Sequence, residues 1–123
     1  MLFCAHSVFY FKLKAFTQDS FLVHENVYLI QAESALIAMV KAEMISKAKE
    51  DLSEDGHLEL NEKKVSYIYA GVRKIIEADC GLSDINLGVL NGLEITYSEL
   101  EVDSIDEVLL LARGSMVNVL YRE

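Results

Sequence analysis

The chain has 123 residues, of which 52% are hydrophobic and 25% are charged, and its net charge at pH 7 is −9. This composition is typical of a folded domain and excludes a disordered chain. No apolar run is long enough to cross a bilayer, and the start lacks the basic region of a signal peptide. With no proline and six glycines, no segment resembles a linker. We therefore expect one cytoplasmic domain, residues 1–123, that does not bind membranes.

The first part of the chain predicts a β-hairpin. Apolar and polar side chains alternate over 7–16, which is typical of a strand with one face in solvent. Turn residues at 17–20 lead into a second strand over 22–31, and a connection this short makes the two strands antiparallel. Ser34 then caps a helix predicted over 35–51.

This helix has two apolar stripes on roughly opposite sides. One stripe contains small residues such as Ala38 and Ala42, which suit close packing on a sheet. The second stripe needs another cover, either the rest of the chain or a partner. It is a candidate oligomer face for a homodimer, formed by Leu36, Ile37, Val40 and Met44.

The middle of the chain has two interpretations. Alternation at Val65, Tyr67 and Tyr69 predicts a strand pair or one bent strand within 58–77, with a bulge at Gly71. A helix over 62–78 is the alternative. The segment 53–56 predicts a turn, and 79–92 a loop that ends in the tight turn Asn91-Gly92.

The last part predicts a strand, a helix and a strand. After a strand over 93–102, Ser104 and Glu107 form the capping box of a short helix that ends before Gly114. A final strand covers 116–121. The order β-β-α-β(β)-β-α-β predicts an α+β fold, with an antiparallel sheet of about five to six strands and two helices on one face.

The charge imbalance lies in one segment. Residues 75–112 hold nine acidic residues and no Lys or Arg, which leaves eleven acids and eleven bases elsewhere. Such a surface repels nucleic acid and attracts basic proteins. Solubility alone is the other explanation. We expect a partner-binding surface with Tyr97 as an aromatic anchor, called here the acidic face, formed by Glu94, Tyr97, Glu99, Glu101, Asp103, Asp106 and Glu107.

Motifs for catalysis, cofactors and metals are absent from the sequence. His6, His24 and His57 are widely spaced, and Cys4 and Cys80 are not in a C-x-x-C pair, so we expect free thiols, no catalytic residues, no metal and no cofactor. Glu99 and Glu101 project to one side of a strand and would suit acid–base chemistry in a cleft. Their acidic neighbours instead favour a solvated ridge.

A small basic patch does not change this expectation. It would be formed by Lys63, Lys64, Arg73 and Lys74, too few bases to favour nucleic-acid binding against the opposing charge of the acidic face.

Several short motifs follow one another along the chain. They are FYFKL at 9–13, Glu25 before a strand that leads to Ala-Glu-Ser at 32–34, YAGV at 69–72 and NGLE at 91–94. In these motifs the chain resembles a family of small bacterial α+β domains of unknown function. The resemblance implies a fold and supplies no catalytic residues. In size and charge the chain is also similar to immunity proteins, which neutralise a toxin domain, frequently a basic nuclease, by tight binding.

Two functions are compatible with these features. We expect a non-catalytic binding protein, most concretely an immunity protein whose acidic face covers a basic toxin domain. The alternative is a small enzyme or metabolite-binding domain with a pocket between the sheet and the helices. Tyr67, Tyr69 or His24 would line that pocket.

Overall fold

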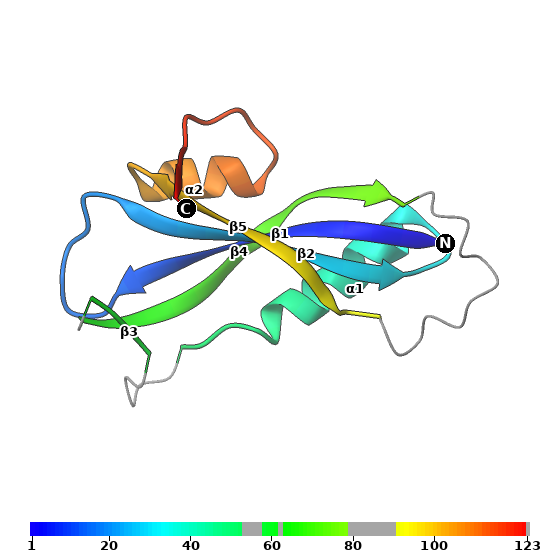
Figure 1. Cartoon of the computed structure of the whole chain (residues 1–123), viewed down its shortest axis with the longest axis horizontal. Coiled ribbons are helices and arrows are strands. Elements are labelled where there is room, and N and C mark those ends of the chain that lie inside the picture. The colour runs from blue at the N-terminus through cyan, green and yellow to red at the C-terminus, as the bar shows by residue number, and fades with distance from the viewer. Residues whose placement is uncertain (53–57, 62, 79–90, 123) are drawn as a thin grey trace.

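The chain folds into a curved antiparallel sheet with helices packed on it (Figure 1). The structure is a computed structural model that describes residues 1–52, 58–61, 63–78 and 91–122. The six strands lie in the order β3-β4-β1-β2-β5-β6, which confirms the predicted α+β fold. The elements are β1 (Leu2–Leu13), β2 (Phe21–Gln31), α1 (Ala35–Lys47), β3 (Glu59–Leu60), β4 (Lys63–Glu77), β5 (Glu94–Val102), α2 (Ile105–Ala112) and β6 (Leu120–Arg122).

Two hydrophobic clusters lie on opposite faces of the central strands. Phe9 belongs to the cluster that α1 covers and Val8 to the cluster that α2 covers, and both side chains are fully buried. Because adjacent residues of a strand point to opposite faces, α1 and α2 lie on opposite sides of the sheet (Figure 1). The expectation of two helices on one face was therefore wrong. The supposed solvent side of β1 is also covered, since Tyr10 packs against Phe21 with ring centroids 6.0 Å apart.

The segment 58–77 is extended, and the helical alternative is excluded. β3 and β4 form a hairpin, and β4 pairs with β1 along its length. The β1–β4 register shifts twice around Gly71, which confirms the predicted bulge. At Gly71, with φ +156°, an added Cβ would lie 3.3 Å from the Cβ of Ala112. The glycine thus allows α2 to approach β4 closely.

α1 ends at Lys47, before the predicted end at residue 51, because the following residues bond to β4. Asp51 exchanges two backbone hydrogen bonds with Tyr67, at 2.9 and 2.8 Å. The carboxylate of Glu50 accepts a hydrogen bond from the backbone N–H of Tyr69 at 2.9 Å. β3 pairs with the first residues of β4. The contacts of Glu50 and Asp51 then satisfy the backbone hydrogen-bonding groups that come next along the same edge of β4.

The outer strands also differ from their predicted lengths. β1 begins at Leu2 rather than residue 7, because β2 and β4 pair with it as far as that end. β6 takes up only the last part of the predicted strand 116–121. An extension of β6 toward residue 118 would need a partner at Asp103, where the chain already turns into α2. Val117 and Val119 pack instead against the α2 cluster. The predicted turn at 53–56 and most of the loop at 79–92 lie outside the described residues.

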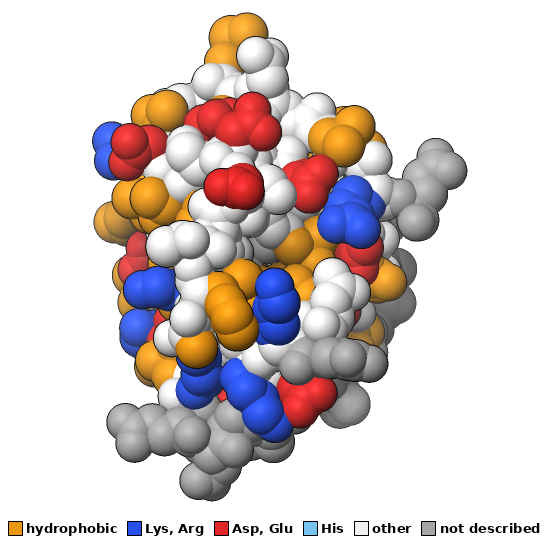
Figure 2. All heavy atoms as spheres, turned by 90° about the vertical axis from the view of Figure 1, so that its left-hand side faces the viewer, with side chains coloured by type: hydrophobic (Ala, Val, Ile, Leu, Met, Phe, Trp, Pro, Cys, Tyr) orange, Lys and Arg blue, Asp and Glu red, His pale blue; other side chains and the backbone are white. Residues whose placement is uncertain are grey.

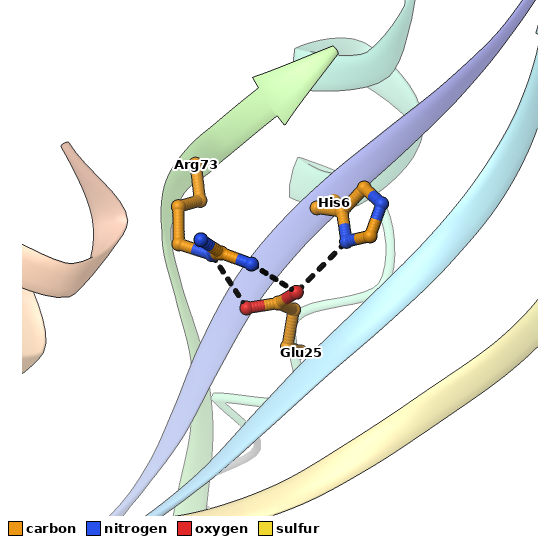
Figure 3. Close-up of polar contacts among 3 residues, drawn as sticks. All are labelled: His6, Glu25 and Arg73. Atoms are coloured by element: carbon orange, nitrogen blue, oxygen red, sulfur yellow. Dashed lines mark hydrogen bonds and ion pairs between the residues drawn. The ribbon is translucent and has the colours of Figure 1, made fainter. Parts of the chain in front are cut away.

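Glu25 joins three strands through polar contacts in the sheet (Figure 3). Its carboxylate accepts hydrogen bonds from Nε and Nη2 of Arg73 on β4, at 2.6 and 2.7 Å, and lies 2.8 Å from Nδ1 of His6 on β1. Glu25 is only 8% exposed. Burial alone would raise the pKa of its carboxyl, but Arg73 and His6 outweigh burial, and the pKa lies below its ordinary value of 4.5. The carboxylate is therefore charged at neutral pH.

Replacing Glu25 with Gln should destabilise the fold by about 2 kcal/mol, because Arg73 loses its charged partner. Since the pKa of Glu25 is lower in the folded than in the unfolded protein, its contribution is present above pH 4.5 and is lost as pH falls through the folded pKa. Urea unfolding between about pH 6 and about pH 3 should therefore show a steeper loss of stability in the wild type than in E25Q. The exposed Glu59, replaced with Gln, is the control and should leave the steep loss intact. Parallel pH profiles for the wild type and E25Q would contradict this role of Glu25.

Candidate protein-binding face

β5 places four residues of the acidic face on one side of the sheet. Its register with β2 sets them directly opposite Tyr28, Asn26, His24 and Leu22, and the four are Glu94, Tyr97, Glu99 and Glu101. Directly paired residues point to the same face of a sheet, and Tyr28 belongs to the cluster that α1 covers. The row therefore lies on the α1 side. α1 packs on β1, β2 and β4 rather than on β5, so the row is at least partly open to solvent. Glu94 and Tyr97 are exposed, whereas Glu99 and Glu101 are half-buried.

The other three residues of the acidic face lie where β5 ends and α2 begins. The hydroxyl of Ser104 accepts a hydrogen bond from the backbone N–H of Glu107 at 3.2 Å, as the capping box predicts. Asp106 and Glu107 lie in the first turn, where the helix dipole favours negative charge. Because α2 covers the opposite side of the sheet, the acidic residues continue around the end of β5. Figure 2 shows this end of the molecule, with most of the Asp and Glu toward α2 and most of the Lys and Arg nearer β3, although some Lys or Arg also lie beside the acids.

Only some of these carboxylates have partners from other parts of the chain. Nη1 of Arg122 lies 3.8 Å from Oε1 of Glu101, which also accepts a hydrogen bond from the hydroxyl of Ser20 at 3.1 Å. Nε2 of His24 lies 3.4 Å from Oε1 of Glu99. Within the described part of the chain, the remaining acids form no ion pair. One arginine does not balance six carboxylates, so the acidic face remains negative.

His24 connects the acidic face to a cluster of aromatic rings. Its ring centroid lies 5.8 Å from that of Tyr67 and 5.6 Å from that of Tyr97. The hydroxyl of Tyr67 accepts a hydrogen bond from Nδ2 of Asn26 at 3.0 Å and lies 3.4 Å from Nδ1 of His24. A neutral imidazole with its proton on Nε2 can accept from Tyr67 and donate to Glu99. The neutral form of His24 can therefore make both hydrogen bonds at once, one with Tyr67 and one with Glu99.

The pKa of His24 lies below its ordinary value of 6.5. Burial lowers the pKa, and the carboxylates of Glu99 and Glu94 offset burial only in part. His24 is therefore uncharged at neutral pH and does not cancel the charge of Glu99. Burial also raises the pKa of Tyr67 above its ordinary value of 10, so the phenol stays protonated. The role of Asn26 could not be predicted from spacing in the sequence, because only the pairing of the strands brings its side chain to Tyr67.

An open groove of about 830 Å³ lies between α1 and β4. Tyr69 lines it, as the alternative function requires, whereas Tyr67 and His24 lie in the ring cluster instead. Burial and the nearby Glu43 raise the pKa of Tyr69 to about 12, so this phenol is not a base at neutral pH. The groove is lined by Glu43, Met44, Lys47, Ala48, Tyr69, Ala70 and Gly71.

Three of the four bases of the expected basic patch contact different neighbours, and the fourth, Lys74, is exposed. Arg73 binds Glu25, while Nζ of Lys64 lies 2.6 Å from Glu59. Nζ of Lys63 lies 4.7 Å from the ring centroid of Phe16. These contacts reduce the positive charge available to a nucleic acid.

Other sequence candidates are distributed over the molecule. Cys4 is a free thiol, whereas Cys80 and His57 lie outside the described residues. Among the residues with described positions, no group of three or more His, Cys, Asp and Glu side chains could hold a metal ion. No helix in that part of the chain is both long and apolar enough to cross a bilayer. The candidate oligomer face is exposed on α1, and its residues are Leu36, Ile37, Val40 and Met44.

Replacing Glu99 with Gln should lower the pKa of His24 further, because Glu99 is the main group that stabilises the protonated imidazole. An NMR titration of the His24 ring protons measures this pKa directly. Glu101→Gln is the matched control and should leave the pKa unchanged. Since the folded pKa of His24 is already below 6.5, stability falls as pH drops below that value, and E99Q should increase this loss. A pKa that is the same in both variants would show that Glu99 does not act on His24.

Comparison of the chain with models of protein families, with curated proteins and with solved structures found no match. The function proposed below is therefore supported by the contacts, burial and charge of the chain itself, together with the resemblances noted in its sequence.

Proposed function

We propose that this protein is a non-catalytic binding module whose acidic face docks a basic protein. The observation that carries the proposal is a row of carboxylates on β5, exposed at Glu94 and half-buried at Glu99 and Glu101. The row continues into the first turn of α2, and Arg122 is its neighbouring arginine. Like charges held this close repel one another in the free protein. Lys and Arg side chains of a partner would relieve that repulsion and speed the encounter.

Tyr97 supplies the contact that gives such a face specificity. More than half of its side chain is exposed, and it lies between Glu94 and Glu99 along β5. An aromatic ring flanked by carboxylates suits an arginine or lysine side chain, which can stack on the ring while it pairs with the acids. Because His24 beside it is neutral at pH 7, the full charge of Glu99 remains available to the partner.

The most concrete form of this function is an immunity protein that neutralises a basic toxin domain. The small size and the net charge of −9 support this class of protein. A nuclease toxin carries positive charge where it binds nucleic acid, and an acidic protein that covers this surface blocks the substrate. Such a protein acts in the cytoplasm of the bacterium that makes the toxin.

The alternative, a small enzyme or metabolite-binding domain, has one supporting observation. The groove between α1 and β4 contains Tyr69 beside Glu43 and Lys47. These side chains line an open surface, and the protonated Tyr69 offers no base for catalysis at neutral pH. The groove therefore supports this function less strongly than the acidic face supports protein binding.

The proposal is tested with a toxin domain encoded beside the gene for this chain. The wild type should bind the purified domain with an affinity that falls steeply as salt is raised from about 50 to about 500 mM. Reversing Glu99 and Glu101 together to Lys should raise Kd by at least about tenfold, mainly through slower association. Calorimetry gives the affinity, and stopped-flow fluorescence gives the association rate.

A control with the same change in net charge separates the acidic face from overall charge. Glu59 and Glu77 lie on β3 and β4, which at least two other strands separate from β5, and reversing both to Lys should leave binding largely intact. Thermal unfolding should show that both double variants remain folded. If the two double variants bind equally well, the acidic face is not the docking surface.

A further inference from the structure

β5 has an open edge beside the short stretch that β6 covers. β6 pairs with β5 only at Glu99, Leu100 and Glu101, and its last described residue, Arg122, lies opposite Glu99. Within the described part of the chain, no strand pairs with residues 94–98 of β5 on this outer side. All of these residues are exposed. This part of β5 is therefore a margin of the sheet that is accessible on both faces and along its edge.

The backbone of Tyr97 points to this open edge. The N–H of Leu29 on β2 donates to the carbonyl oxygen of Leu93 at 2.9 Å, so Leu29 presents its backbone to β5. Backbone groups alternate in direction along a strand, so Val27 does the same, and its partner Thr96 points back to β2. Tyr97 is the next residue and therefore points its N–H and C=O away from β2. Among the described residues, neither group has a hydrogen-bond partner.

The side chains beside this edge favour a basic occupant. Tyr97 is 55% exposed and shares its side of the sheet with Glu94 and Glu99. A residue of an added strand that lies opposite Tyr97 would point to the same side, where a long side chain reaches both the ring and Glu99. Lys or Arg fits this position, because its charge pairs with the carboxylate while its stem packs on the ring. A second copy of β5 would bring its own carboxylates to the row and would be repelled.

We infer that the partner adds an extended, basic segment to the sheet as a strand beside β5, in line with β6. This inference rests on the proposed function and specifies how the partner binds. Hydrogen bonds to the backbone of Tyr97 give affinity, and the alternating side chains of the segment give specificity. Leu93 and Ile95, which are 49% and 47% exposed, offer an apolar contact where the segment continues past Tyr97. The segment thus combines a basic residue opposite Tyr97 with apolar residues toward Leu93.

Hydrogen exchange of the wild type tests strand addition. NMR follows the amides of the chain, free and in complex with the toxin domain encoded beside its gene. An added strand should slow exchange of the Tyr97 amide at least about tenfold, because its N–H becomes hydrogen-bonded. The amide of Met116, between α2 and β6, is the control and should be unchanged. A domain that binds without protecting Tyr97 would overturn this inference and leave the proposed function intact, whereas a domain that does not bind contradicts both.

Two substitutions of Tyr97 separate its backbone from its side chain. Tyr97→Ala removes the ring and keeps the N–H, whereas Tyr97→Pro removes both. Proline is tolerated on an edge strand where its nitrogen faces solvent, so the Pro variant should stay folded, which thermal unfolding checks. Y97P should bind the toxin domain at least about tenfold more weakly than Y97A, because a carbonyl of the added strand loses its donor. Equal affinities of the two folded variants, measured by calorimetry, would reject strand addition.

Discussion

Burial of both faces of the central strands is the constraint on which the rest of the structure depends. Val8 and Phe9 follow one another on β1 and are both fully buried, so each face needs its own helix. Full burial of a large apolar side chain contributes about 1.5 to 3 kcal/mol, and losing one helix would expose a whole cluster. Apolar patterning on two faces fixes the register of a strand less firmly than patterning on one face. Glu25 helps to fix the register of the central strands, because its carboxylate meets Arg73 and His6 in one register only.

The same register assembles the acidic face. Pairing of β5 with β2 places Glu99 beside His24 and Tyr97 opposite Asn26, residues that are far apart in the sequence. His24 then lies among rings that keep it neutral, which preserves the charge of its acidic neighbour. The hydrophobic packing and the electrostatics of the surface are therefore set by one pattern of strand pairing.

Local patterns in the sequence predicted most of the elements. Both helix caps and the bulge follow from short-range chemistry at Ser34, Ser104 and Gly71, and the order of elements along the chain follows from local patterning. The side of the sheet on which each helix lies could not be predicted, because Val8 and Phe9 alternate between two apolar faces. The end of α1 was also missed, since it depends on hydrogen bonds to β4.

Of the candidate site, the sequence indicated which residues carry charge and not how they are arranged. The acidic segment was recognised from composition alone, but its division between the two sides of the sheet follows from the position of α2. The Arg122–Glu101 contact and the environment of His24 arise from pairing between distant strands. Glu25, present in the sequence only as part of a motif, proved to be buried and to accept two hydrogen bonds from Arg73.

The contacts of Glu50 and Asp51 with β4 have a consequence for solubility. An open strand edge offers backbone N–H and C=O groups on which another chain can polymerise. Both groups of Tyr67 and the N–H of Tyr69 are already bonded to Asp51 and Glu50 of the chain itself. The opposite margin of the sheet is β6, which is three residues long and ends in the charged Arg122. Fibre growth by strand addition is therefore disfavoured at these positions. Contacts with other proteins there would be made by side chains rather than by the backbone.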